Sequence, residues 1–253
     1  MTCKKGCLIV FEGNDGAGKT TALNTCAARL KEKGYPVLVT REPGGAPVAE
    51  KIRSLLLEIG NDMDPKTEAL LYAASRREHL VKTILPAIEA GQIILCDRFL
   101  DSSLAYQGYG RRLGREAVEA LNDFGLEGFR PDLVLFFALD VETEARRMAG
   151  RGQPDRLDLE DKAFHERVRE GFEALNRRAD DSAGRIVVDA AQSREAVADF
   201  ALAQIEDWLK ACGLNHPGQP ASSASQLQEA LKAKPDASCF PENTGNNTGT
   251  DHD

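Results

Sequence analysis

The sequence predicts an α/β fold in which a five-stranded parallel sheet is flanked by helices on both faces. Five short apolar runs alternate with longer amphipathic segments, and this alternation is typical of parallel strands joined by crossover helices. The chain has 253 residues, which suits one large α/β domain. Hydrophobic residues make up 42% and charged residues 28%, so collagen, coiled-coil and wholly disordered chains are excluded.

The expected strands are continuous apolar runs, because a parallel sheet is covered on both faces. They are Cys7–Glu12, Pro36–Thr40, Ile93–Cys96, Leu133–Leu139 and Arg185–Val188. The expected helices are Lys19–Lys33, Val48–Ile59, Pro65–Ala90, Ala163–Asp180 and Ser193–Cys212. The last of these starts at a serine that can cap it, and a glycine follows it where a helix commonly ends.

The composition changes after Gly213. Residues 214–253 are rich in Pro, Ser, Gln, Asn, Gly and Thr and carry few large apolar side chains. Such a segment cannot bury enough surface to offset the entropy of ordering. We therefore predict two regions, a folded domain at 1–213 and a disordered polar tail at 214–253.

The net charge, the apolar runs and the cysteine spacing indicate which partners and which cellular compartment to expect. The net charge is −8, and a broadly acidic surface repels a phosphate backbone, so we expect no nucleic-acid partner. The longest apolar runs are far too short to cross a bilayer, and the N-terminal residues lack the apolar core of a signal peptide. The six cysteines form no C-x-x-C pair, which favours reduced thiols. We expect a cytoplasmic protein without a membrane partner.

A glycine-rich loop gives the first functional signal. The run 13–20 fits G-x-x-x-x-G-K-[ST], follows an apolar run and opens a helical segment, which disfavours an ordinary glycine-rich turn. Backbone N–H groups of such a loop bind phosphate, the lysine reaches the β- and γ-phosphates, and the Thr20 hydroxyl binds Mg²⁺. The predicted ATP-binding residues here are Gly13, Asn14, Asp15, Gly16, Ala17, Gly18, Lys19, Thr20 and Thr21.

Three charged residues suggest a second substrate. Asp15 lies inside the phosphate loop, where a carboxylate either accepts a hydrogen bond from a sugar hydroxyl or simply faces solvent. Asp97 ends the third expected strand, a position from which such folds hold a metal through water. Arg98 beside it offers a planar fork for phosphate. The alternative for this pair is an Asp–Arg ion pair that holds a loop.

Further motifs extend this pattern along the chain. They are Thr40-Arg41-Glu42-Pro43-Gly44-Gly45, the run 49–57, Leu71-Tyr72-Ala73-Ala74-Ser75-Arg76, Asp97-Arg98-Phe99 and Ala105-Tyr106-Gln107-Gly108. Together with Asp15, this set resembles the bacterial thymidylate kinases (dTMP kinases) over about residues 6–212. The resemblance implies a sheet of the P-loop kinase type, usually in a homodimer. It also implies transfer of the γ-phosphoryl group of ATP to dTMP, giving ADP and dTDP for dTTP supply, with Mg²⁺ as cofactor.

The resemblance also implies roles for individual residues. Asp15 should hold the 3′-hydroxyl of dTMP, Arg76 should donate to thymine O4, and Tyr106 should crowd a ribose 2′-hydroxyl. The implied dTMP-binding residues are Asp15, Arg53, Tyr72, Arg76, Arg98, Ser102, Tyr106 and Gln107, and the implied metal-site residues are Thr20 and Asp97. Tyr72 replaces the usual stacking Phe and keeps the ring. Ser75 replaces an Asp, and Phe99 replaces Tyr or His, so a local salt bridge and a hydrogen bond from the ring are expected to be absent.

A basic segment is expected to supply the positive charge that surrounds the migrating phosphoryl group. Phosphoryl transfer needs positive charge around the migrating group, yet no arginine lies between Gly13 and Lys19. The segment 146–156 is basic and interrupted by glycines. It resembles the lid of the family, in the subgroup whose lid supplies the arginine that acts on the migrating group. The alternative is a basic loop that is simply solvated. Arg151 best matches the catalytic position, and Arg156 is the second choice. Arg147 is expected to pack on adenine, and the implied catalytic residues are Lys19, Arg98, Arg151 and Arg156.

Two other functions compete with this interpretation. One is another small P-loop kinase acting on dUMP, CMP or a deoxynucleoside. The other is a nucleotide-binding switch or ATPase that phosphorylates nothing and turns over ATP without dTMP. Two arginines that clamp a phosphate favour a monophosphate acceptor over a nucleoside.

Overall fold

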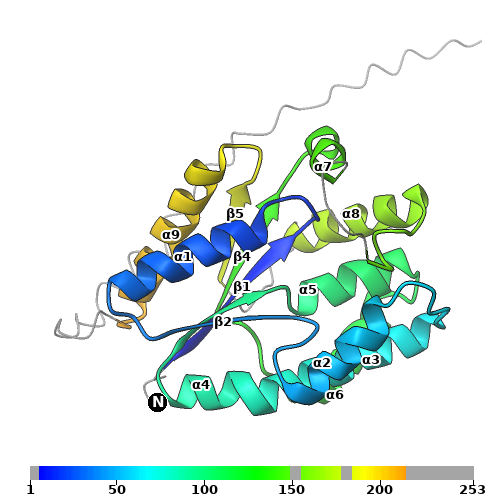
Figure 1. Ribbon diagram of the computed structural model, residues 1–253, viewed down its shortest axis with the longest axis horizontal. Coiled ribbons are helices and arrows are strands. Elements are labelled where there is room, and N and C mark those ends of the chain that lie inside the picture. Colours follow the sequence, from blue (N-terminus) through cyan, green and yellow to red (C-terminus); the bar gives the residue numbers. More distant parts are fainter. Residues whose placement is uncertain (1–5, 149–154, 178–183, 215–253) are drawn as a thin grey trace, which may run out of the picture.

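The computed structural model describes residues 6–148, 155–177 and 184–214. Its single sheet has five parallel strands in the order β2-β3-β1-β4-β5 (Figure 1). The strands are β1 (Cys7–Gly13), β2 (Val37–Arg41), β3 (Ile93–Asp97), β4 (Leu133–Ala138) and β5 (Gly184–Asp189). Each lies within a residue or two of its expected range, and the predicted five-stranded parallel sheet is confirmed.

Helices cover both faces of the sheet (Figure 1). On one face, α1 (Lys19–Glu32) and α9 (Arg194–Ala211) pack against Ile9 and Phe11 of β1. On the other face, α8 (Lys162–Asn176) and neighbouring helices pack against Leu8 and Val10 of the same strand. Successive side chains of a strand point to opposite faces, so one apolar run supplies both cores.

One long helical segment was predicted at Pro65–Ala90 and is found. It consists of α3 (Pro65–His79), the π-helical turn η1 (Leu80–Ile84) and α4 (Leu85–Glu89). The Asp64 carboxylate caps it by accepting from the N–H groups of Lys66 and Thr67. Pro86 has no N–H for the preceding turn, and the wider π turn before it accommodates the ring.

Several shorter helices were not predicted from the sequence. They are α5 (Leu100–Ser103), the π-helical segment η2 (Leu104–Gly110), α6 (Arg115–Leu126) and α7 (Val141–Met148). Residues Leu104–Gly108 of η2 are all buried, so this stretch has no polar face to give a helical period. The remaining helix, α2 (Pro47–Leu57), lies close to its expected range.

The predicted tail lies almost wholly outside the described residues. The last of them, Leu214, packs partly buried against the core, and its N–H donates to the Leu209 carbonyl. Gly213 has φ +70°, the conformation that ends many helices, as predicted for this position. Within the three described stretches, no helix combines the length and the apolar character of a membrane span.

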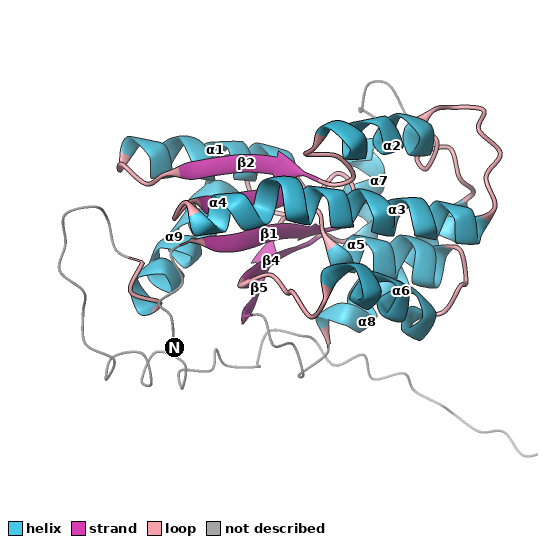
Figure 2. Cartoon of the chain, turned by 90° about the horizontal axis from the view of Figure 1, so that it is seen from below, coloured by secondary structure: helices cyan, strands magenta, loops and turns pink. Residues whose placement is uncertain are grey.

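The parallel strands bring their carboxyl ends to one edge of the sheet. At this edge Gly13 has φ +124°, and a Cβ there would lie 2.4 Å from the Phe137 carbonyl oxygen of β4, so only glycine fits. The chain can therefore turn into the loop that follows β1. Figure 2 shows α2 beyond the same edge, and its residues Arg53 and Leu57 line a cleft there.

Candidate functional site

A cleft of about 780 Å³ opens at the carboxyl edge of the sheet. Residues from the loop after β1, the loops after β2 and β3, and from α2, α3, η2 and α9 line it. Its lining includes these predicted site residues: Asp15, Gly16, Ala17, Gly18, Lys19, Thr20, Thr21, Arg53, Tyr72, Arg76, Asp97, Arg98, Ser102, Tyr106, Gln107 and Arg147. The fold therefore assembles one site from segments far apart in the sequence.

The phosphate loop surrounds Lys19. The Lys19 Nζ donates to the carbonyl oxygens of Gly13 at 2.8 Å and Asn14 at 2.5 Å. Burial, and secondarily the charge of Arg98, lower the pKa of Lys19 to about 8. α1 begins at this lysine, and Gly18 before it has φ +80°. The buried ammonium and the start of a helix thus face the same space, which suits a phosphate.

Thr20 of α1 meets Asp97 at the end of β3. The Thr20 hydroxyl donates to the Asp97 carboxylate, which stands at the end of β3. Hydroxyl and carboxylate oxygens are ligands for hard cations such as Mg²⁺. Among the described residues, no group of three or more His, Cys, Asp or Glu side chains could hold a metal alone. A cation between Thr20 and Asp97 would therefore need further ligands from a nucleotide and water.

Asp15 joins the phosphate loop to the segment after β3. Its Oδ1 lies 2.6 Å from Arg98 Nη2, and the Tyr106 hydroxyl donates to its Oδ2. Burial and the charge of Asp15 raise the pKa of Tyr106, so its phenol stays neutral. Arg98 Nη1 donates to Ser102 Oγ at 2.9 Å. The alternative role for Arg98 was an ion pair with Asp97 that holds a loop. Arg98 does form an ion pair, but its partner is Asp15.

Arg76 is held rigidly at the base of the cleft. It is 2% exposed, and its guanidinium carbon lies 5.2 Å from the centre of the Phe99 ring. Four N–H groups donate within the protein: to Glu42 Oε2 at 2.7 Å, Ser103 Oγ at 3.0 Å, the Phe99 carbonyl at 2.8 Å and Asn122 Oδ1. A guanidinium has five N–H groups, so one remains for a ligand.

Further hydrogen bonds hold the residues around Arg76 in place. His79 Nδ1 lies 3.0 Å from Glu42 Oε1, and its Nε2 lies 2.8 Å from Thr40 Oγ1. The Ser75 hydroxyl accepts from the Gly44 N–H at 3.2 Å. Ser75, a departure from the family pattern, therefore supports the loop after β2.

Three more predicted residues line the cleft from α2, α3 and η2. Arg53 Nη1 donates to the Pro43 carbonyl at 2.8 Å, and burial followed by the charge of Arg41 lowers the pKa of Arg53. Burial, with the charge of Glu68, raises the pKa of Tyr72, so its ring stays neutral. Gln107 donates from Nε2 to Glu68 Oε1 at 2.8 Å, while its buried Oε1 has no partner.

The predicted lid arginines lie in different environments. Arg147 Nη1 donates to the carbonyls of Gly16 at 3.3 Å and Ala190 at 2.9 Å, so it bridges the phosphate loop and the segment after β5. Arg156 is 9% exposed, does not line the cleft, and pairs with Glu68 at 2.6 Å. Arg151 lies outside the described residues.

Sequence reasoning missed three carboxylates behind the cleft. Glu12 accepts from the Phe99 N–H and the Ser102 hydroxyl, each at 2.7 Å, and burial followed by the charge of Asp101 raises its pKa to about 7. Glu144 accepts from Asn14 Nδ2 at 3.0 Å, and Glu68 binds Gln107. For Glu12 a signal existed, because a carboxylate at the end of an apolar strand needs a partner.

Fold and site define a P-loop nucleotide kinase, with a phosphate loop after the central strand and two further arginines, Arg53 and Arg98, in the same cleft. The family described as Thymidylate kinase matches residues 11–201. A thymidylate kinase of Halalkalibacterium halodurans is 50% identical over 210 residues, covering 81% of this chain and 98% of its own length. One from Geobacillus sp. is 46% identical over 209 residues, covering 81% and 99%.

A solved structure gives the same result. The crystal structure of thymidylate kinase from Ehrlichia chaffeensis matches with a TM-score of 0.63 and 32% identity, over 79% of this chain and 98% of that one. The chain therefore belongs to the thymidylate kinase family. The prediction of an ATP-dependent kinase that converts dTMP to dTDP is confirmed.

Lys19 leads to a prediction about protons. Its pKa of about 8 in the free protein should rise when the negative phosphates of ATP stabilise its ammonium. We expect ATP binding to take up roughly half a proton at pH 8, where about half of the free protein has lost it, and less at pH 7. Calorimetry in two buffers of different ionisation enthalpy measures this uptake.

The Lys19→Arg variant is the matched control, because arginine stays protonated at both pH values. It should show no uptake that depends on this group. Equal uptake by the variant and the wild type at pH 8 would assign the proton to another residue.

Proposed function

We propose that this chain catalyses phosphoryl transfer by positioning ATP and dTMP in the one cleft and stabilising charge, without a covalent protein intermediate. The observation that carries the proposal is the convergence of two anion-binding groups. Lys19 and the start of α1 line the cleft together with Arg98 and Arg53. Such an arrangement lets a donor phosphate and an acceptor phosphate meet, which is the main requirement for phosphoryl transfer.

The acceptor side supports dTMP in several ways. Arg98 and Tyr106 hold the Asp15 carboxylate at the cleft, and a carboxylate is an acceptor suited to the sugar 3′-hydroxyl. The remaining N–H of Arg76 suits thymine O4. The unpartnered Oε1 of Gln107 calls for a donor, and thymine supplies one at N3.

The ring and phosphate contacts complete the acceptor site. Tyr72 stacks on the base, and Tyr106 crowds a ribose 2′-hydroxyl. Arg53 and Arg98 hold the acceptor phosphate, while Ser102 orients Arg98. Because Arg98 is paired with Asp15, its guanidinium is already oriented in the unliganded protein.

Magnesium fits the oxygen pair at the end of β3. We assign Thr20 as a direct ligand and Asp97 as a holder of metal-bound water. When bound, Mg²⁺ neutralises charge on the phosphates of ATP. Gly13, Asn14 and the other loop residues up to Thr21 hold those phosphates, and Arg147 borders the adenine side of the cleft.

The charge for the transferring group is assigned to Arg151. Arg156 is occupied by Glu68 and by the Leu56 carbonyl at 2.9 Å, so it serves as an anchor for the segment after residue 154. Arg147 is likewise occupied by two carbonyls. Of the two arginines first considered for this role, Arg151 is therefore the better candidate.

The decisive experiment is a coupled assay of ADP release with a panel of monophosphates. We expect dTMP to have the highest kcat/KM and ribose TMP to be poor. dUMP should retain weak activity, since one methyl contact is worth about 1–3 kcal/mol. Equal kcat/KM for dTMP and CMP would overturn the acceptor assignment, and ADP release independent of dTMP would favour an ATPase.

Arginine variants separate the transfer step from acceptor binding. Arg151→Met should lower kcat by about 10²–10⁵ and leave dTMP affinity unchanged, because the contact forms only during transfer. Arg98→Met should weaken dTMP binding as well as kcat. Calorimetry and steady-state kinetics give the two quantities. Retention of kcat within a few-fold in Arg151→Met would show that the charge comes from elsewhere.

We further propose a homodimer, supported by exposed apolar side chains on three neighbouring helices. Leu70 of α3 is 55% exposed and Phe124 of α6 is 88% exposed, and Val48 and Leu55 of α2 are also exposed. α3 packs between α2 and α6 (Figure 2). Apolar groups gathered in this way mark interaction surfaces, and a second copy would cover them.

Sedimentation tests this surface. The wild type should sediment as a dimer, and Leu70→Asp combined with Phe124→Asp should give monomers, because burying two carboxylates at the interface is unfavourable. Phe200→Asp is the control, since this exposed ring lies on α9, on the opposite face of the sheet. A dimer that survives the double substitution would place the interface elsewhere.

We also propose a division of the chain into two regions and a cellular location. We assign residues 1–213 to the kinase domain and 214–253 to a separate tail, supported by the family match, which ends at residue 201, and by the end of α9 at Ala211. We assign the protein to the cytoplasm, supported by the buried thiols of Cys26 and Cys96, which form no disulfide.

A further inference from the structure

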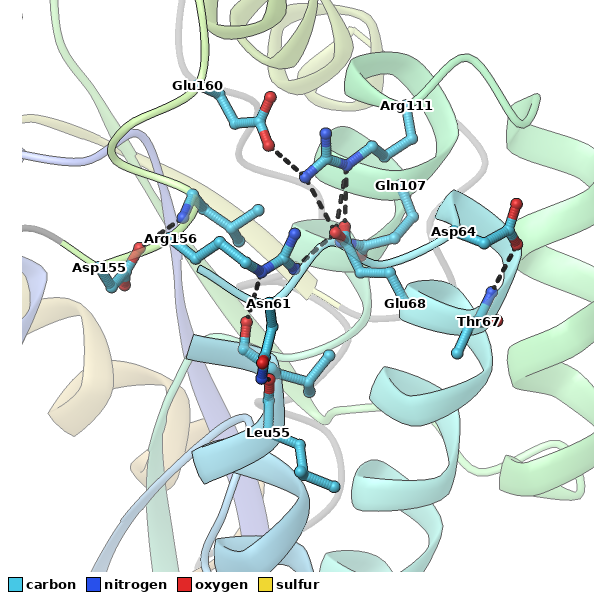
Figure 3. A network of polar contacts seen from close by, with 12 residues as sticks. Leu55, Asn61, Asp64, Thr67, Glu68, Gln107, Arg111, Asp155, Arg156 and Glu160 are labelled. Atoms are coloured by element: carbon cyan, nitrogen blue, oxygen red, sulfur yellow. Dashed lines mark hydrogen bonds and ion pairs between the residues drawn. The ribbon is translucent and has the colours of Figure 1, made fainter. Parts of the chain in front are cut away.

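Glu68 is a buried carboxylate at the meeting point of three segments. It stands on α3 with no exposed surface, and it accepts hydrogen bonds from Gln107 of η2, Arg111 just after η2, and Arg156 (Figure 3). Arg111 is also paired with Glu160 at 2.5 Å. Burial opposes ionisation, but hydrogen bonds from Arg111, Gln107 and Arg156 outweigh it and lower the pKa of Glu68. Glu68 is therefore an ion that only accepts hydrogen bonds.

The two oxygens of Glu68 have different partners. Oε2 accepts from both guanidiniums, at 2.6 Å from Arg156 Nη2 and 2.9 Å from Arg111 Nη2. Oε1 accepts from Gln107 Nε2 at 2.8 Å, with a longer contact of 3.2 Å from Arg111 Nε. The arginines thus hold the carboxylate in place, and its Oε1 accepts the hydrogen bond from the Gln107 amide.

This contact decides which way the Gln107 amide faces. A carboxylate cannot donate, so Gln107 must turn its NH₂ group toward Glu68. Its Oε1 then points away, and it is buried without a partner in a residue that lines the cleft. An unpaired buried acceptor is unfavourable until a ligand donates to it.

We propose that Glu68 is a positioning residue for base recognition, which orients the Gln107 amide so that an acceptor faces the base and pyrimidines with an N3–H are selected. The inference rests on the proposed dTMP pocket. Thymine and uracil carry a hydrogen at N3, whereas neutral cytosine has a lone pair there. Cytosine would therefore set its N3 acceptor against the Gln107 oxygen, and neither would be satisfied.

Glu68→Gln should weaken this selection. The arginines offer only donors, so the new amide keeps its oxygen on them and turns its NH₂ group toward Gln107. The Gln107 amide then turns over and presents its own NH₂ group to the base. We expect the ratio of kcat/KM for dTMP over dCMP to fall about 10- to 100-fold. The ratio for dTMP over dUMP should not change, because both bases carry the N3–H.

Two variants isolate the effect. Glu160→Gln removes one negative charge from the same network through Arg111 but does not contact Gln107, so it should leave the dTMP/dCMP ratio unchanged. Gln107→Met removes the amide, and adding Glu68→Gln to it should have no further effect on the ratio. Should Glu68→Gln alone not fold, Glu68→Gln with Arg156→Met restores the charge balance and is expected to show the same fall.

The outcomes distinguish the inference from the function on which it rests. A wild type that accepts dCMP as well as dTMP would overturn the proposed base pocket and the role of Glu68 together. A selective wild type whose dTMP/dCMP ratio survives Glu68→Gln would overturn the role of Glu68 alone. Equal losses for dTMP, dUMP and dCMP would likewise show that Glu68 only stabilises the fold.

Discussion

The ion pair between Asp15 and Arg98 joins the two halves of the cleft. Asp15 belongs to the loop after β1 and Arg98 to the loop after β3, and the two strands are neighbours in the sheet. Without its carboxylate partner, a partly buried guanidinium beside Lys19 would be unfavourable. The pair therefore allows two cations, Lys19 and Arg98, to stand close together at the Gly13 carbonyl.

Three buried carboxylates orient other residues of the site. Glu42 holds Arg76, Glu12 holds Ser102, and Glu68 holds Gln107. In each case the carboxylate accepts hydrogen bonds from a residue that itself lines the cleft. Substrate recognition is preorganised because the orienting carboxyl groups are buried and hydrogen-bonded on both oxygens, which leaves the cleft-lining side chains few alternative conformations.

Much of this was predictable from local patterns. The five strands and the long helix at Pro65–Ala90 follow from the spacing of apolar residues, and the phosphate loop follows from its glycines and lysine. The buried segment Leu104–Gly110 gave no such pattern, because its surroundings, not its own sequence, make it helical. Arg156 looked like a catalytic cation in a basic run, yet its charge is taken by a carboxylate 88 residues away.

The sequence by itself determined the sheet, the phosphate loop and the kinase family, because periodicity and short motifs are properties of neighbouring residues. Only the tertiary structure decided which partner each charged side chain has. A buried charge must be neutralised by whichever group the fold brings within a few ångströms, and that group can come from any segment. Asp15 therefore pairs with Arg98, Glu68 with Arg156, and the amide of Gln107 acquires its direction only in the folded protein.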